Sequence, residues 1–178
     1  MNNKPEQIIL QIEDNLLDIK LVRGMLDKIA SFNYKLITAE TLKDGCELIE
    51  KNNIILVLLD LNLPDSTGKQ TFDTVINIAE NIPIVLVTSL EDVELSLSLI
   101  KEGAQDYITK RTLNRPLLEK TIQFAIERKK LLSELLRKTN ELKQTMNYFA
   151  DRELKMIDLK VEVNELLKKL GEEKKYDW

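Results

Sequence analysis

The chain has 178 residues, with 26 basic and 30 acidic side chains, a formal net charge of −4, and 43% hydrophobic residues. That length suffices for one domain with an appendage, and no apolar run approaches the ~18 residues of a membrane-spanning helix, so no membrane partner is expected. The sequence has no histidine, which excludes Ser-His-Asp and Cys-His catalysis and histidine metal sites. Cys46 is the only cysteine, which excludes an internal disulfide and favours a cytoplasmic setting.

The charge is divided unevenly along the chain. Residues 1–127 carry 20 acidic and 13 basic side chains, whereas residues 128–178 carry 10 acidic and 13 basic ones. The basic residues of the second part are interspersed with acids, a pattern typical of a solvated helix surface. Neither part therefore has the basic patch of a nucleic-acid-binding protein, and no nucleic-acid partner is expected.

Apolar stretches alternate with helical patterns through the first part of the chain. Apolar residues between the stretches recur at spacings of three and four, which indicates helices. Strands that alternate with helices predict a parallel sheet with helices on both faces. The stretches predicted as strands are residues 8–12, 34–39, 54–59, 84–88 and 106–110.

The central strand leads directly into an acid. Its six apolar residues, 54–59, predict a strand buried on both faces, and Asp60 follows them. Residues 61–68 contain Pro64 and Gly68 and are predicted to form a loop. Ligands of open parallel sheets bind beyond the carboxyl ends of the strands, so Asp60 is a candidate site carboxylate. Taken alone, it fits a solvated turn residue equally well.

Further polar residues follow the other predicted strands. Glu13 and Asp14 follow the first strand, Thr88 ends the fourth, and Lys110 ends the fifth. Carboxylates close together are electrostatically unfavourable without a cation, and oxygen ligands alone suit a hard ion such as Mg²⁺. A carboxylate can attack phosphorus to form an aspartyl-phosphate, and a metal and a lysine offset the charge of the transferring group. This ordered set favours a site built around Asp60.

These residues carry a resemblance to a known family. Residues 1–127 resemble the receiver domain of response regulators in two-component signalling, which implies a flavodoxin-like five-stranded parallel sheet of order 2-1-3-4-5. The stretches that match are residues 12–15, 59–68, 87–89 and 103–110.

The resemblance implies a phosphoacceptor and a metal site. Asp60 would accept phosphate from a histidine kinase or a phosphotransfer protein. Glu13, Asp14, Asp60 and the backbone carbonyl of Asn62 would hold Mg²⁺. Beyond transfer of phosphate to its own Asp60, no enzyme activity is expected.

The resemblance also implies a switch. Thr88 would move to bond the phosphoryl group, Tyr107 would follow it inward, and Lys110 would pair with the phosphoryl oxygens. Many receivers place a proline in a cis bond after this lysine, whereas this sequence has Arg111, so the local loop departs from the family pattern. Tyr107 is otherwise interpreted as a half-buried aromatic residue of a strand.

The second part, residues 128–178, is predicted to be a helical coiled-coil extension. No glycine or proline interrupts residues 117–170, and part of this stretch, residues 152–160, resembles helical linkers of multidomain sensor kinases. Its apolar residues recur at spacings of three and four and form two coiled-coil seams, that is, two stripes that could pair with another helix. The second seam is displaced by one residue from the first, so a skip or break is expected in residues 149–153. The chain is predicted to form a homodimer through this helix; a helix folded back on the domain is the alternative. The first seam comprises Leu132, Leu135, Thr139, Leu142, Met146 and Phe149, and the second comprises Leu154, Ile157 and Val161.

The leading hypothesis is a phosphorylation-dependent signalling switch that acts through a dimeric helix. One alternative is a receiver-like scaffold or dimerisation module that is never phosphorylated; the intact set of acids argues against it. Another is a Mg²⁺-dependent phosphohydrolase that uses Asp60. The residues after Asp60 are Leu-Asn-Leu, so no second acid stands two positions on to protonate a leaving group, which weakens this interpretation.

Overall fold

The computed structural model of the chain describes residues 7–29, 33–89 and 93–176. It divides into two compact units, Met1–Leu132 and Ser133–Trp178. The first unit contains a parallel sheet and its covering helices, and the second is helical. Within the described ranges, each helix is too short or too polar to span a bilayer.

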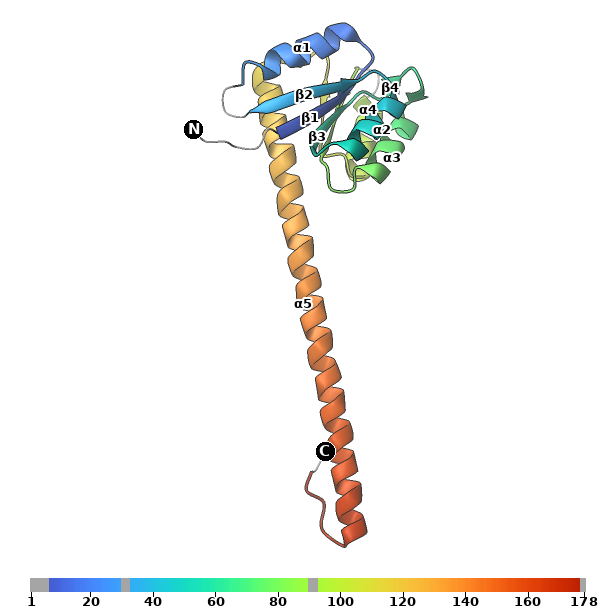
Figure 1. Ribbon diagram of the computed structural model, residues 1–178, viewed down its shortest axis with the longest axis vertical. Helices are drawn as coiled ribbons and strands as arrows, with labels where there is room; N and C mark the ends of the chain where they lie inside the picture. Colours follow the sequence, from blue (N-terminus) through green and yellow to red (C-terminus); the bar gives the residue numbers. More distant parts are fainter. Residues whose placement is uncertain (1–6, 30–32, 90–92, 177–178) are drawn as a thin grey trace. The chain divides into compact units, whose positions relative to one another are not determined.

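The first unit is built around a five-stranded parallel sheet (Figure 1). Its order is β2-β1-β3-β6-β7, which confirms the predicted order 2-1-3-4-5. The strands are β1 (Gln7–Ile12), β2 (Tyr34–Ala39), β3 (Ile54–Leu59), β6 (Ile84–Thr88) and β7 (Asp106–Thr109). The helices are α1 (Leu16–Leu26), α2 (Leu42–Lys51), α3 (Lys69–Ile78), α4 (Val93–Lys101) and α5 (Arg115–Leu170).

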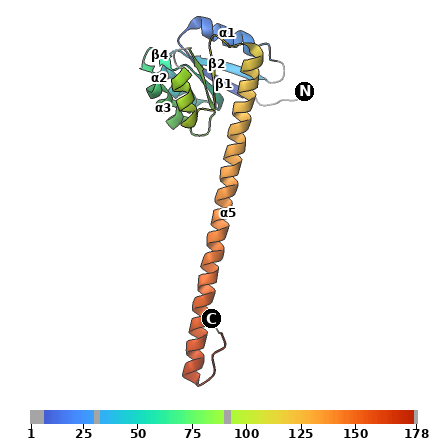
Figure 2. The ribbon, with the colours of Figure 1, turned by 180° about the vertical axis from the view of Figure 1, so that it is seen from behind.

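Helices cover both faces of the sheet (Figures 1 and 2). Side chains of α2, α3 and α4 pack against one face, and those of α1 and the first turns of α5 pack against the other. The central strand β3 contributes to both cores, since Val57 and Leu59 belong to the first and Leu56 and Leu58 to the second. Burial on both faces explains why its sequence is an unbroken apolar run.

Local side-chain bonds fix where the helices begin. The side chain of Asn15 accepts a hydrogen bond of 2.9 Å from the N–H of Leu17, so α1 begins directly after the acid pair. Thr41 caps α2 in the same way through the N–H of Asp44. Such caps satisfy N–H groups that have no partner inside the helix.

The segment after Asp60 forms a hairpin where the sequence predicted a loop. Strands β4 (Asn62–Leu63) and β5 (Ser66–Thr67) pair in antiparallel fashion. The buried hydroxyl of Thr71 donates to the carbonyl of Leu61 at 3.0 Å and lies 2.9 Å from the hydroxyl of Ser66. Because these contacts tie both ends of the hairpin to α3, the residues that follow Asp60 are held in place.

Helix α5 is continuous across residues 149–153, so the break that the sequence allowed there is wrong; the shift in register stays a prediction. The predicted shift needs no break, because an α-helix can change the face that carries its apolar residues without a proline or a glycine. The seam side chains of the second unit are exposed to solvent. Their exposed fractions include 62% for Leu135, 65% for Leu142, 71% for Met146 and 60% for Phe149.

The second unit ends in a turn that reverses the chain direction. Gly171 has φ +78°, and its N–H and that of Glu172 donate to the carbonyls of Lys168 and Leu167. This arrangement is a Schellman cap, which favours glycine at the left-handed position. Residues 172–176 then run back beside the last turns of α5, as both ribbon views show (Figures 1 and 2).

Candidate functional site

The backbone places two site residues at the carboxyl edge of the sheet. The N–H of Asp60 donates to the carbonyl of Ile12 at 3.0 Å, and the N–H of Lys110 donates to the carbonyl of Thr88 at 2.8 Å. The parallel ladder therefore continues beyond the last residues of β3 and β7. This regular backbone leaves little freedom in where the two side chains begin.

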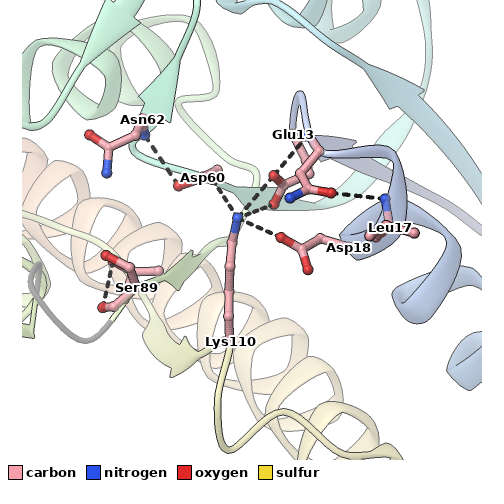
Figure 3. A network of polar contacts seen from close by, with 9 residues as sticks. Glu13, Leu17, Asp18, Asp60, Asn62, Ser89 and Lys110 are labelled. Carbon is pink, nitrogen blue, oxygen red and sulfur yellow. Dashed lines mark hydrogen bonds and ion pairs between the residues drawn. The ribbon is translucent and has the colours of Figure 1, made fainter.

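The ammonium group of Lys110 is the centre of the polar network at this edge (Figure 3). Its Nζ lies 2.7 Å from Oδ2 of Asp60, 2.9 Å from Oε1 and 2.8 Å from Oε2 of Glu13, and 2.9 Å from Oδ2 of Asp18. Glu13 and Asp60 are buried, with 1% and 5% of their surface exposed. Buried carboxylates are stable only with such partners, so the contacts with the lysine stabilise both carboxylates.

Burial and neighbouring charge shift two pKa values here. Burial, assisted by the charge of Asp60, raises the pKa of Glu13 to about 7, although the bond to Lys110 opposes the shift. Burial alone would lower the pKa of Lys110. Its hydrogen bonds to Asp60, Glu13 and Asp18 outweigh that effect, and the pKa of Lys110 is raised above its ordinary value. The lysine is therefore positively charged throughout the physiological range.

Three carboxylates of the site fit a hard divalent cation. Glu13, Asp14 and Asp60 each offer an oxygen, and these oxygens lie within 4.8 Å of one another. Oε2 of Glu13 is buried without a hydrogen-bond partner of good geometry, although it lies close to Lys110 Nζ. Asp14 is exposed, so water can reach its side of the cluster. Oxygen ligands beside open solvent suit Mg²⁺, which usually keeps several of its waters.

The remaining predicted residues lie around this centre. The N–H of Asn62 donates to Oδ1 of Asp60 at 3.2 Å, while the Asn62 side chain is exposed. Thr88 is fully buried at the end of β6, and its hydroxyl donates to the carbonyl of Ser89 at 3.3 Å (Figure 3). Tyr107 is half-buried on β7 and packs against the core on the α2, α3 and α4 side. The peptide bond that follows Lys110 is trans.

Sequence reasoning missed Asp18. This residue lies in the first turn of α1, where an acid is common because it complements the positive end of the helix dipole. The sequence offered that ordinary explanation, and nothing in the spacing connects Asp18 with Lys110. Its one available signal was its position only four residues after Asp14, close to the acids that follow the first strand.

The sequence matches a known family over most of the first unit. The family described as Response regulator receiver domain matches residues 9–123, which is more than half of the chain. The chain belongs to the response regulator receiver family. The resemblance inferred from residues 12–15, 59–68, 87–89 and 103–110 is thereby confirmed, together with the flavodoxin-like fold.

Several relatives share this receiver domain. Hybrid signal transduction histidine kinase D of Dictyostelium discoideum is 28% identical over 155 residues, which cover 83% of this chain and 9% of the relative. The cell cycle transcriptional regulator CtrA of Caulobacter vibrioides is 31% identical over 102 residues, or 57% of this chain and 43% of the relative. This chain therefore spans less than half the length of these curated relatives.

Solved structures agree with the fold. A response regulator receiver domain protein from Clostridium thermocellum is similar with a TM-score of 0.63 and 25% identity; the match covers 71% of this chain and 98% of that one. The signal receiver domain of a putative Luxo repressor protein from Vibrio parahaemolyticus has a TM-score of 0.62 and 26% identity, with 74% and 98% covered. The similarity thus spans nearly the whole of each receiver and leaves part of this chain unmatched.

Proposed function

We propose that this receiver is a phosphorylation-dependent switch of a two-component system, with Asp60 as the phosphoacceptor. The donor would be a histidine kinase or a phosphotransfer protein. The setting would be cytoplasmic, as the lone Cys46 suggests. The observation that carries the proposal is the 2.7 Å contact between Lys110 Nζ and Oδ2 of Asp60, beside two further acids that fit a cation.

The chemistry follows from the groups present. A carboxylate oxygen of Asp60 forms a bond to phosphorus while the bond from phosphorus to the donor's nitrogen breaks, and the leaving nitrogen takes up a proton. The phosphoryl oxygens carry negative charge, which the ammonium group of Lys110 would offset. The burial of Asp60 keeps water away from the reacting carboxylate and strengthens its interaction with the lysine.

Glu13, Asp14, Asp60 and the backbone carbonyl of Asn62 would hold Mg²⁺. When bound, the cation supplies positive charge that stabilises the phosphoryl group during transfer. The oxygen donors of the three carboxylates, close together and partly open to water, support this part of the proposal. Asp14 would provide the ligand that is most exposed to solvent.

Thr88 and Tyr107 would carry the signal away from the site. Thr88 stands at the end of β6, the neighbour of β7, and its hydroxyl donates a hydrogen bond to the carbonyl of Ser89. A phosphoryl group on Asp60 would offer this hydroxyl a charged acceptor, which makes a stronger hydrogen bond than a neutral carbonyl. Tyr107 is half-buried and would move inward after Thr88.

Mass spectrometry tests the assignment of Asp60. The full chain is incubated with phosphoramidate, a donor with a phosphorus–nitrogen bond, in the presence and absence of Mg²⁺. We expect a gain of one phosphate that needs Mg²⁺ and is absent in Asp60→Asn. Asp27→Asn, an exposed acid at the other end of α1, is the charge-matched control. A stable phosphate on Asp60→Asn would show that the acceptor is another residue.

We also propose a parallel homodimer held by the helix from about Leu117 to Leu170. Large apolar side chains of this helix are exposed at spacings of three and four, and an exposed stripe of this kind gains stability by pairing. Each buried side chain would contribute about 1.5–3 kcal/mol before the cost of association. Parallel pairing places two receivers at the same end of the pair, so both can bias it together.

Two measurements on the full chain test the dimer. Light scattering should give twice the mass of one chain, and Leu142→Lys should shift this value toward that of a monomer. Glu141→Lys, at an exposed neighbouring position, is the control. In a Cys46→Ser background, Leu142→Cys should cross-link readily, because identical seam positions face each other only in a parallel pair. A wild-type monomer at micromolar concentration would contradict the dimer.

A further inference from the structure

Asp18 contacts the central lysine but lies outside the set of carboxylates that fit a cation. Its Oδ2 is 2.9 Å from Lys110 Nζ, and both side chains are 24% exposed. The cation-fitting set comprises Glu13, Asp14 and Asp60 among the described residues. Figure 3 shows Asp18 reaching the ammonium group from α1, on a different side from Asp60.

The ammonium group of lysine has three N–H donors and no acceptor. Here its carboxylate neighbours are Glu13, Asp18 and Asp60, one for each donor. Two of them, Glu13 and Asp60, would also be ligands of a bound cation, so their oxygens would be shared with it. Of these three neighbours of Lys110, Asp18 is the one that is not also a candidate ligand of the cation.

The first turn of α1 holds Asp18 in place. The N–H of Asn15 donates to Oε1 of Glu13 at 3.2 Å, and the Asn15 side chain caps the helix through Leu17. Glu13 and the start of α1 are therefore linked by short local bonds. The first turn of a helix is also where the helix dipole favours an acidic side chain, so the position of Asp18 is favourable for a contact with Lys110.

We propose that Asp18 is a positioning residue that holds the ammonium group of Lys110 over Asp60 when Glu13 and Asp60 engage Mg²⁺. The inference rests on the proposed role of Asp60 as the phosphoacceptor. Without Asp18, the lysine would rely on Glu13 and Asp60 alone and would compete with the cation for their oxygens. After transfer, the N–H that pointed to Asp60 turns to a phosphoryl oxygen, and the bond to Asp18 persists.

A double-mutant cycle on the full chain tests this through Mg²⁺ affinity. Calorimetric titration with MgCl₂ compares wild type, Asp18→Ala, Lys110→Ala and the double variant. We expect Asp18→Ala to weaken Mg²⁺ binding by about threefold or more when Lys110 is present, and by less than about twofold when it is absent. Asp18→Asn keeps an acceptor and should give an intermediate value. Asp27→Ala, which removes the same charge from the other end of α1, should change affinity by less than about twofold.

The rate of phosphorylation gives a second reading. At saturating Mg²⁺ with phosphoramidate, Asp18→Ala should react several times more slowly than wild type, and it should add no further loss in the Lys110→Ala background. An unchanged rate in Asp18→Ala, or equal losses of Mg²⁺ affinity with and without Lys110, would overturn the proposal. If wild type takes up no phosphate, the proposed function fails, and the Mg²⁺ cycle alone decides the role of Asp18.

Discussion

The carboxylate of Asp65 accepts a hydrogen bond of 2.8 Å from the N–H of Leu42, the first residue of α2. Its second oxygen accepts from the N–H of Lys43 at 3.0 Å. Asp65 lies in the turn between β4 and β5, so it ties the hairpin that follows Asp60 to the start of another helix. These bonds, with that to Leu42 foremost, lower the pKa of Asp65 below its ordinary value of 3.8.

Replacement of Asp65 should weaken this link. Asp65→Ala leaves two N–H groups of α2 without their partner and should lower the free energy of unfolding by about 1 kcal/mol at pH 7. Asp65→Asn retains one acceptor and should lose less. Because the pKa of Asp65 is lowered on folding, its contribution exists above pH 3.8 and disappears as the pH falls through the lowered value. Urea unfolding of wild type and variant at pH 7 and at a series of pH values below 3.8 measures both effects; equal stability of the two proteins at pH 7 would contradict the cap.

A second prediction concerns the close approach of α2 to β1. A β-carbon on Gly45 would lie 2.5 Å from Cδ1 of Ile12, the residue before Glu13. Gly45→Ala should therefore lower the free energy of unfolding by about 1–3 kcal/mol, since Ile12 is fully buried and has little room to shift. It should also weaken Mg²⁺ binding through Glu13.

Gly24 provides the matched control for that substitution. It also lies within a helix, α1, but a β-carbon there would meet nothing within 4 Å. Gly24→Ala should raise the free energy of unfolding by about 0.5–1 kcal/mol, because alanine favours helix interiors. Thermal unfolding of the two variants should thus shift in opposite directions. A destabilised Gly24→Ala would show that the helix-propensity argument fails in this chain.

The sequence predicted the strands and the site edge because both follow local patterns. A strand that is buried on both faces has an unbroken apolar sequence, as residues 54–59 do. Parallel strands bring their carboxyl ends to one edge of the sheet, so Asp60 and Lys110, which each follow or end a predicted strand, could be assigned to one site. Asp18 and Asp65 were missed because each has an ordinary local explanation, in a first helical turn and in a turn beside Pro64. Their partners are distant in sequence, and only the folded chain brings them together.

The third prediction concerns pH and Mg²⁺. The pKa of Glu13 is raised from 4.5 to about 7 on folding, chiefly by burial. When folding raises the pKa of a carboxyl group, the protonated group contributes to the free energy of unfolding. For Glu13 this contribution is fully present below pH 4.5 and is lost as the pH rises through 7, because the buried carboxyl group must then ionise. In metal-free buffer this loss should be on the order of 1–3 kcal/mol between pH 5 and pH 8.

Mg²⁺ should reverse that loss, because the cation binds the ionised form of Glu13. The increase in melting temperature on addition of Mg²⁺ should therefore be larger at pH 8 than at pH 5. Glu13→Gln cannot ionise, so it should show a flatter dependence on pH without metal and a smaller response to Mg²⁺. Differential scanning calorimetry with and without Mg²⁺ at the two pH values measures this. An equal Mg²⁺ response at both pH values would exclude Glu13 as the group responsible.

The last prediction concerns the segment that runs back along the end of α5. The side chain of Asn164 binds the backbone of this segment through three hydrogen bonds. Its Nδ2 donates to the carbonyl of Tyr176 at 2.7 Å, and its Oδ1 accepts from the N–H groups of Lys175 and Tyr176 at 3.1 Å each. Asn164 is 8% exposed, whereas most of α5 around it is open to solvent. Tyr176 lines a small surface pocket together with Met156 and Val163.

Asn164→Ala removes all three of these bonds and should release residues 172–176 while α5 stays helical. Each bond contributes about 0.5–1.5 kcal/mol, so the amide hydrogen of Tyr176 should exchange at least about tenfold faster in the variant. Circular dichroism should change little, because the helix does not depend on the segment. Asn140→Ala, at an exposed position of the same helix, should leave the exchange of Tyr176 unchanged.

Met156 and Val163 lie seven and fourteen residues after Phe149, so they continue the first seam. Release of the segment should therefore increase the exposure of Val163, whereas Met156 is already 52% exposed. An unaltered exchange rate in Asn164→Ala would show that other contacts hold the segment in place.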